Sequence, residues 1–119
     1  MLSVKKATTN DISLIREFAM QVWPQTYTPI LGPEQVAYML NLFYSHDALE
    51  KQIDEHGHRF IICFDNDTPI GFASYSDIGP GIFKLHKLYV LTGQQGKGAG
   101  RFMTDYIANE LRSEGNTAL

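Results

Sequence analysis

A glycine-rich segment between a strand pattern and a helix pattern constrains the fold of this chain most strongly. Glycines stand at alternate positions in the stretch Gln95-Gly96-Lys97-Gly98-Ala99-Gly100-Arg101. The apolar run 85–90 precedes this stretch, and an apolar face of helical spacing follows it, at Phe102, Met103, Tyr106, Ile107 and Leu111. A strand that passes through a short glycine loop directly into a helix predicts an α/β unit whose helix N-terminus faces the loop.

The chemistry of such a loop favours a phosphate ligand. The first amides of a helix have no intrahelical acceptor, and the aligned peptide dipoles place partial positive charge beside them. Glycine leaves room for a diphosphate to approach these amides, while Lys97 and Arg101 add cationic donors. A flexible turn is the alternative for a glycine cluster by itself. The segment lacks the Gly-Lys-Ser/Thr ending of a P-loop, and no second strand with an acidic residue follows to bind a ribose.

Helical patterns fill most of the N-terminal half. After a short strand over 2–7, Asn10 is the preferred cap of a helix whose apolar face recurs every three or four residues up to Trp23. Pro24 is expected to end that helix, and residues 25–32 to form a loop. Pro33 then begins a second helix, and a third helix is expected over about 47–55.

Strand patterns dominate from residue 58 onward. Runs 58–64 and 70–76, joined by the polar turn 65–69, predict a hairpin, and a further strand covers 82–90. The helix after the glycine loop is expected to end near Ser113, and residues 116–119 resemble the opening of another strand. We therefore predict one α/β domain over 1–119, a mixed sheet flanked by helices with a parallel last crossover. A chain that stops as a strand begins is expected to be incomplete at its C-terminus.

Composition excludes several classes of function. With 44% hydrophobic and 19% charged residues, the chain suits a packed globular domain, and a net charge of −3 without a basic run argues against nucleic acid or anionic membranes as partners. No signal-peptide or membrane-spanning run is present, which predicts a cytoplasmic protein. The single Cys63 lies in an apolar strand, so we expect a buried thiol. His46, His56 and His58 lack a shared ligand spacing, so no metal site is predicted.

The motif Gln95-x-x-Gly98-x-Gly100, preceded by Leu88-Tyr89-Val90, resembles the pyrophosphate motif of the GNAT acetyltransferase superfamily. The order of helices, hairpin and strand is similar to that family over nearly the whole chain. The resemblance implies that acetyl-CoA is the cofactor, that backbone amides hold its pyrophosphate, and that the backbone of Leu88, Tyr89 and Val90 receives the pantetheine arm and acetyl carbonyl. The amides concerned are those of Gln95, Gly96, Lys97, Gly98, Ala99, Gly100 and Arg101.

The same resemblance implies a missing section. In the family, a strand, a helix and a hairpin follow the region that corresponds to residues 1–119, and they supply an Asn contact to the cofactor and a Tyr that acts as general acid. We therefore expect a C-terminally truncated member of this family.

Three residues are candidates for binding the acceptor amine or removing its proton. Relatives carry a base on the strand before the loop, where Lys84, His86 and Leu88 are expected to share a face, so His86 is the candidate base. A packed structural histidine is the alternative. Trp23 and Tyr27 lie where the family walls its acceptor cleft, and the surrounding segment resembles in part the polyamine-acetylating branch; a core role for both is the alternative.

These observations predict an N-acetyltransferase that moves an acetyl group from acetyl-CoA to a primary amine in a direct ternary complex. One alternative is a non-catalytic acyl-CoA-binding module with a sensing or regulatory role. Another is a homodimer in which a partner strand completes the open sheet edge.

Overall fold

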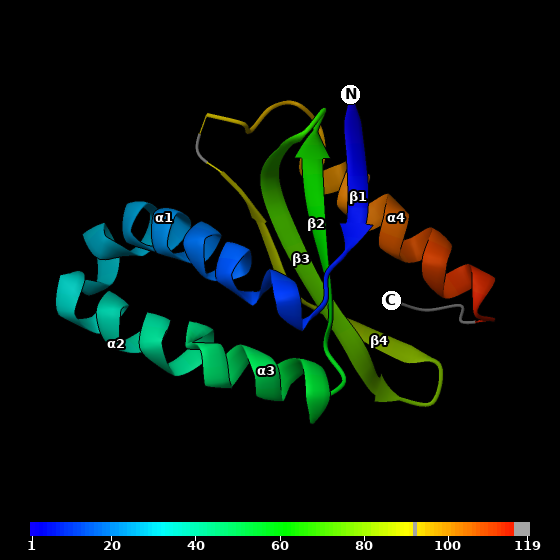
Figure 1. The fold of residues 1–119 in the computed structure, drawn as a ribbon, viewed down its shortest axis with the longest axis horizontal. Coiled ribbons are helices and arrows are strands. Elements are labelled where there is room, and N and C mark those ends of the chain that lie inside the picture. Colours follow the sequence, from blue (N-terminus) through cyan, green and yellow to red (C-terminus); the bar gives the residue numbers. More distant parts are fainter. Residues whose placement is uncertain (92, 116–119) are drawn as a thin grey trace.

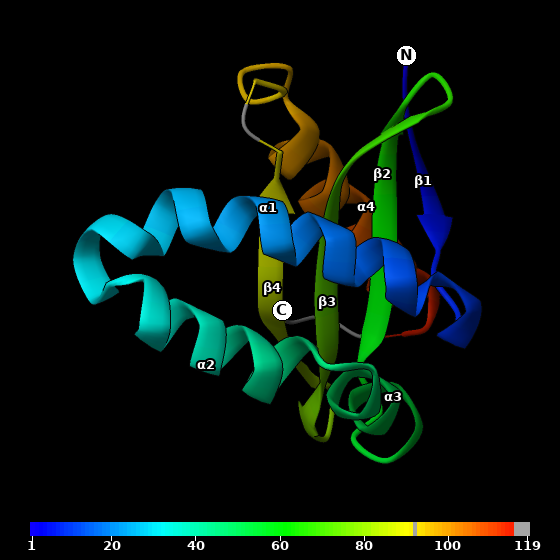
Figure 2. The same cartoon turned by 60° about the vertical axis from the view of Figure 1, so that its left-hand side comes forward.

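The structure, a computed structural model, describes residues 1–91 and 93–115. It has three layers, in which a twisted sheet lies between helices on its two faces (Figure 1). Every neighbouring pair of strands is antiparallel, in the order β1-β2-β3-β4. The strands are β1 (Leu2–Lys6), β2 (Arg59–Asp65), β3 (Thr68–Gly79) and β4 (Ile82–Val90). The helices are α1 (Ile12–Leu31), α2 (Pro33–Tyr44), α3 (His46–Asp54) and α4 (Ala99–Ser113), with a 3-10 turn η1 (Thr9–Asp11) before α1. Figure 2 shows α1 and α2 crossing one face of the sheet and α4 covering the other.

The alternation of side chains along the strands builds a core on each face. Ile62 and Phe72 pack with α1, α2 and α3, whereas their neighbours Ile61 and Ala73 pack with α4. All four side chains are at most 1% exposed. Burial on both faces explains why the central strands consist almost entirely of apolar and small residues.

The first helix is longer than the sequence pattern predicts, and the expected end at Pro24 is wrong. α1 continues through Pro24 and Pro29 and ends only at Leu31, where the amide of the C-cap residue Gly32 donates to the carbonyl of Thr28 at 2.9 Å. Each proline removes one backbone donor, yet Trp23 and Tyr27, one turn apart, pack with ring centroids 4.6 Å apart. Packing of this aromatic face against α2 offsets the lost hydrogen bonds.

The N-terminal cap also differs from the expectation. Thr8, not Asn10, is the cap: its side chain accepts from the amide of Asn10 at 3.3 Å, and Asp11 accepts from the amide of Thr8 at 2.9 Å. The 3-10 turn η1 precedes α1, so the reciprocal capping pair begins at Thr8, two residues before the expected cap Asn10.

A β-bulge at His86 decides which side chains of β4 share a face. Ser74 pairs with Lys87 and Tyr75 pairs with Leu85, so His86 is an extra residue without a partner on β3. His86 and Lys87, although adjacent, therefore both lie on the face covered by α1, α2 and α3. The expectation that His86 and Leu88 share a face is wrong, because a bulge breaks the two-residue alternation between them.

The α/β class, the hairpin 65–69, and the strand-loop-helix unit are confirmed. The sheet is antiparallel throughout the described ranges, and the predicted strand at 116–119, with its parallel crossover, lies outside them. Cys63 is fully buried, as expected, and burial raises the pKa of its thiol. Among the described helices, none has both the length and the apolar character needed to cross a membrane.

Candidate functional site

The loop between β4 and α4 presents a helix N-terminus with free amides. Gly98 caps α4, and the helical ladder begins where the amide of Phe102 donates to the carbonyl of Gly98 at 2.9 Å. Within residues 1–91 and 93–115, nothing accepts a hydrogen bond from the amides of Ala99, Gly100 and Arg101. These groups and the helix dipole form an anion site of the kind that binds phosphate.

The three glycines of the loop serve different purposes. Gly96 and Gly98 adopt φ of 89° and 80°, in the left-handed region that disfavours residues with a side chain. Gly100 does not, and a Cβ added there would meet only Leu88, with Cδ2 at 4.0 Å. The fold itself thus tolerates a side chain at residue 100. The open space above this glycine and the free amides together fit the diphosphate of a coenzyme A.

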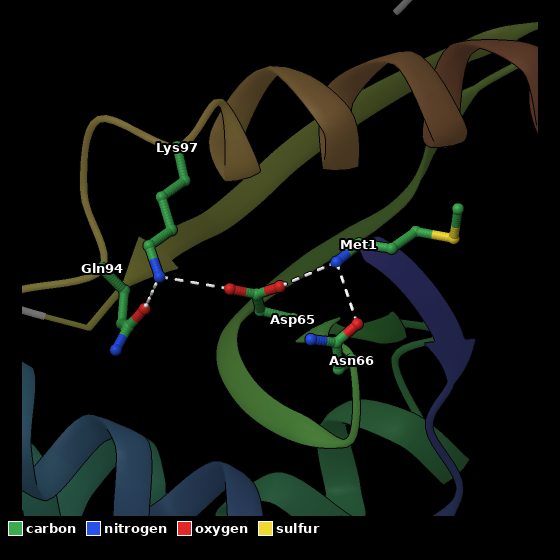
Figure 3. Close-up of polar contacts among 5 residues, drawn as sticks. All are labelled: Met1, Asp65, Asn66, Gln94 and Lys97. Carbon is green, nitrogen blue, oxygen red and sulfur yellow. Dashed lines mark hydrogen bonds and ion pairs between the residues drawn. The ribbon is translucent and has the colours of Figure 1, made fainter.

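Lys97, one of the predicted cationic donors, is already paired. Its Nζ lies 3.1 Å from Asp65 Oδ2 and 2.8 Å from Gln94 Oε1, and Asp65 in turn accepts from the amino group of Met1 at 3.0 Å (Figure 3). The contact with Met1, followed by that with Lys97, lowers the pKa of Asp65. The β2–β3 hairpin therefore holds the glycine loop through an ion pair that the sequence did not suggest. Arg101 is highly exposed, and its nearest carboxylate, Asp105, is 3.9 Å away.

Close packing of β3, β4 and α4 fixes the strand that leads into the loop. A Cβ on Gly71 would lie 2.5 Å from the carbonyl oxygen of Tyr89 and 3.3 Å from both Val90 Cα and Met103 Cε. Only glycine allows β4 to lie this near to β3 at Tyr89 and Val90. The opposite edge of β4 has no partner strand in the described part of the chain. Leu88, which precedes Tyr89 on this strand, is 38% exposed.

The bulge brings His86 into a cluster of polar side chains. Nε2 of His86 lies 2.5 Å from Ser76 Oγ, and its ring stacks on that of His58 with centroids 4.1 Å apart. Burial, followed by the charges of Lys87 and Lys84, lowers the pKa of His86. Burial also lowers the pKa of His58 to about 4, with the neighbouring His86 as the next cause. Both rings are therefore neutral at pH 7, and His86 can accept a proton.

Lys87 extends from the same bulge toward α2 and α3. Its Nζ lies 5.5 Å from the ring centroids of both Tyr44 and Phe60 and donates to Gln52 Oε1 at 2.8 Å. Burial lowers its pKa to about 8. Lys87 was not among the residues predicted from sequence, because a lysine in a strand pattern gives no sign of burial.

The predicted acceptor residues Trp23 and Tyr27 belong to an aromatic cluster between α1, α2 and the sheet. Trp23 is only 8% exposed and contacts Tyr44 at a centroid distance of 5.8 Å. Tyr89 of β4 is packed against the same core, and burial, with Tyr27 as the next cause, raises its pKa to about 12. This cluster connects the predicted acceptor wall with the strand of the candidate base. A role for Trp23 or Tyr27 in substrate binding stays a prediction.

Several residues of the site were not indicated by any pattern in the sequence. His58, Ser76 and Lys87 surround His86, but they come from three separate segments, and no spacing in the sequence relates them. His58 and Ser76 meet His86 only through the bulged pairing of β3 and β4. Asp65, predicted as a turn residue, also holds Lys97. In the described part of the chain, no group of three or more His, Cys, Asp or Glu side chains is arranged so that it could hold a metal ion.

Comparison with known proteins agrees with this geometry. The sequence model of the acetyltransferase (GNAT) family matches residues 16–119. This chain belongs to the GNAT family. No curated protein sequence matches it.

Solved structures of GNAT and other acetyltransferases share the fold at low sequence identity. PaiA N-acetyltransferase from Thermoplasma acidophilum, in complex with coenzyme A, superposes with a TM-score of 0.84 at 21% identity, covering 97% of this chain and 74% of that one. A predicted acetyltransferase from Clostridium acetobutylicum, solved with acetyl-CoA, gives a TM-score of 0.69 at 17% identity, covering 99% of this chain and 78% of that one. Ribosomal-protein-alanine N-acetyltransferase from Brucella melitensis gives 0.69 at 10%, covering 100% and 77%. These neighbours carry different names at similar folds, so the fold leaves the acceptor open.

Proposed function

We propose that this GNAT-family chain transfers an acetyl group from acetyl-CoA to a primary amine in a direct ternary complex. The observation that carries the proposal is that the amides of Ala99, Gly100 and Arg101 have no acceptor among the described residues, beyond the end of the strand that the family uses for its acyl donor. The GNAT neighbours solved with coenzyme A or acetyl-CoA support acyl-CoA binding in the family. Acetyl-CoA would supply an activated acyl group whose thioester is open to attack by an amine.

In this proposal the loop residues 95–101 bind the pyrophosphate through their amides, with Arg101 as an added cation. The backbone of Leu88, Tyr89 and Val90 receives the pantetheine arm along the edge of β4 that has no partner among the described strands. Gly71 holds that strand in place from the other side. Trp23 and Tyr27 contribute to the acceptor wall through the aromatic cluster that reaches Tyr89.

His86 acts as the general base. The amine must lose a proton as its nitrogen bonds to the acetyl carbon and the carbon–sulfur bond breaks, with the thiolate leaving as coenzyme A. His86 is neutral at pH 7, and Ser76 and the stacked His58 fix its ring. Because Ser76 Oγ lies 2.5 Å from Nε2, its hydroxyl can relay the proton to His86.

Calorimetry and a thiol-release assay test this proposal together. Titration with acetyl-CoA is expected to give one saturable site, and a panel of primary amines is expected to stimulate the release of coenzyme A. Binding without thiol release for any amine would instead favour the non-catalytic acyl-CoA-binding module. Absence of binding would overturn both assignments.

A further inference from the structure

Lys87 is a half-buried cation that forms no ion pair with a carboxylate among residues 1–91 and 93–115. Its Nζ lies between the rings of Tyr44 and Phe60, and its one hydrogen bond among the described residues goes to the neutral oxygen of Gln52, at 2.8 Å. An ammonium group has three donors, so two N–H groups stay available. Aromatic faces attract the cation but do not neutralise its charge.

The wider neighbourhood of Lys87 is also basic. Lys84 and His86 lie on the same strand, and His58 stacks on His86. The charges that shift the pKa values of His58 and His86 all belong to lysines and histidines, and each of these shifts is downward. No described carboxylate contributes to the pKa of Lys87, which burial alone lowers. At pH 7 the two histidines are neutral, and the positive charge of Lys87 has no carboxylate partner among the described residues.

A buried charge without a counterion is costly to the folded protein. A charged ligand can remove this cost by supplying the missing partner, and a charge-assisted hydrogen bond to a carboxylate or phosphate is roughly twice as strong as a neutral one. A polycation approaching the same surface would instead meet like charge. An amine that also carries an acid group would therefore be favoured at Lys87 over a polycation.

We propose that Lys87 binds an anionic group of the acceptor, so that the substrate class is primary amines that also carry a carboxylate or a phosphate. The inference rests on the proposed acetyltransferase function and sharpens it. Lys87 follows His86 directly and lies on the same face, so an acid group on Lys87 would hold the amine of a small acceptor near the candidate base. This assignment disfavours polyamines, which the sequence resemblance had suggested in part.

Matched pairs of amines test the proposal. We would compare kcat/KM for leucine against leucinamide and for phosphoethanolamine against ethanolamine, with spermidine as a polycation. We expect the acidic member of at least one pair to be favoured by about 10-fold or more, the scale of one charge-assisted contact. The leucine pair reports a carboxylate and the ethanolamine pair a phosphate. Leucinamide has the less basic amine, so the intrinsic chemical bias runs against the expected result.

Substitution at Lys87 then assigns the preference to this side chain. Lys87→Met, which keeps the apolar stem, and Lys87→Gln are each expected to abolish the preference for the acidic member while leaving acetyl-CoA affinity unchanged. Lys51→Gln, an exposed lysine of α3 beside Gln52, is the charge-matched control and should retain the preference. Equal use of both members by the unmodified protein, a preference for spermidine, or a preference that persists in both Lys87 variants would overturn the proposal.

A binding experiment tests the anion site at Lys87 if the chain proves to have no acetyltransferase activity. Absence of thiol release with every amine would contradict the acetyltransferase assignment, and the anion site would then be tested by binding alone. Leucine and phosphoethanolamine would be titrated separately into the protein saturated with coenzyme A, while NMR follows the ring protons of His58 and His86. Shifts that vanish in Lys87→Met would support an anion site at Lys87, whereas unchanged ring signals would overturn it.

Discussion

The imidazole rings of His58 and His86 stack face to face, with centroids 4.1 Å apart and planes 4° apart. Stacked rings this close cannot both carry a proton without strong repulsion, and the adjacent Lys87 adds to the penalty. Nδ1 of His58 is buried and has no hydrogen-bond partner within the described residues. The pair therefore stays neutral, and this has consequences for both stability and catalysis.

Stability should fall as the pH drops through the range between the two pKa values of His58. The pKa is 6.5 in the unfolded chain and about 4 in the folded protein, so the unfolded state binds more protons in this range. We expect the free energy of unfolding to decrease from pH 6.5 to 4 by on the order of 1 kcal/mol, a value reduced for partial solvent screening. Chemical denaturation at several pH values measures it.

His58→Phe provides the control for this pH dependence, because phenylalanine can stack on His86 but cannot titrate. The slope of unfolding free energy between pH 6.5 and 4 should become shallower in this variant. Asp11 and Asp65, whose pKa values are lowered below 3.8, affect stability mainly below this range. An identical slope in both proteins would contradict the assignment of the effect to His58.

Replacement of the candidate base should slow transfer without preventing cofactor binding. We expect His86→Gln to reduce kcat by about 10²- to 10⁴-fold, the usual contribution of a general base. In the unmodified protein, the decline of kcat/KM that protonation of His86 causes should lie below pH 6.5, because the pKa of His86 is lowered. His46→Gln, at an exposed histidine of α3, is the control. A pH profile that is the same in His86→Gln would remove His86 from the mechanism.

Gly71→Ala should lower the stability of the protein and shift β4, the strand along which we propose that acetyl-CoA binds. The added Cβ would lie 2.5 Å from the carbonyl oxygen of Tyr89, so β4 must shift, at a cost of about 1–3 kcal/mol. Gly79→Ala, in the same strand, meets nothing within 4 Å and serves as the matched control. Thermal unfolding and acetyl-CoA titration of both variants provide the measurement. Equal melting temperatures and equal acetyl-CoA affinities in the two variants would show that β3 and β4 do not pack tightly at Gly71.

Gly100→Ala should lower acetyl-CoA affinity without lowering the stability of the protein. Its backbone φ lies outside the left-handed region, and the only contact of a new Cβ would be Leu88 at 4.0 Å. Alanine should therefore preserve stability or raise it by up to about 1 kcal/mol through helix propensity. The methyl group would, however, stand next to the amide of residue 100, where we propose that the diphosphate binds. We expect acetyl-CoA affinity to fall about 10-fold or more by calorimetry, and unchanged affinity would place the diphosphate elsewhere.

Asp65→Asn should change the behaviour of Lys97. Without the carboxylate 3.1 Å away, the ammonium of Lys97 becomes free to turn toward a bound diphosphate. We expect acetyl-CoA to bind a few-fold more tightly at low salt, with a steeper salt dependence, and stability to change by less than about 1 kcal/mol. Asp67→Asn, in the same hairpin turn, is the control. Weaker binding in Asp65→Asn would show that the ion pair instead holds the loop in its binding conformation.

The sequence alone determined the strand-loop-helix unit, because the arrangement of these elements follows from local patterns. Glycines between an apolar strand and an amphipathic helix dictate a helix N-terminus with free amides, whatever surrounds them. The hairpin at 65–69 and the buried Cys63 followed from equally local patterns. Helix ends were less predictable, since α1 continues through two prolines only by virtue of its packing against α2.

Tertiary structure alone decided which side chains surround the candidate base His86. One extra residue in β4 turns His86 and Lys87 to the same face, and no periodicity in the sequence marks such a bulge. His58, Ser76 and Gln52 reach this face from three other elements, so their contacts depend on strand register and helix placement. Whether a lysine is solvated or lacks a counterion likewise depends on the residues around it in the folded protein, so the order of residues in the sequence does not show it.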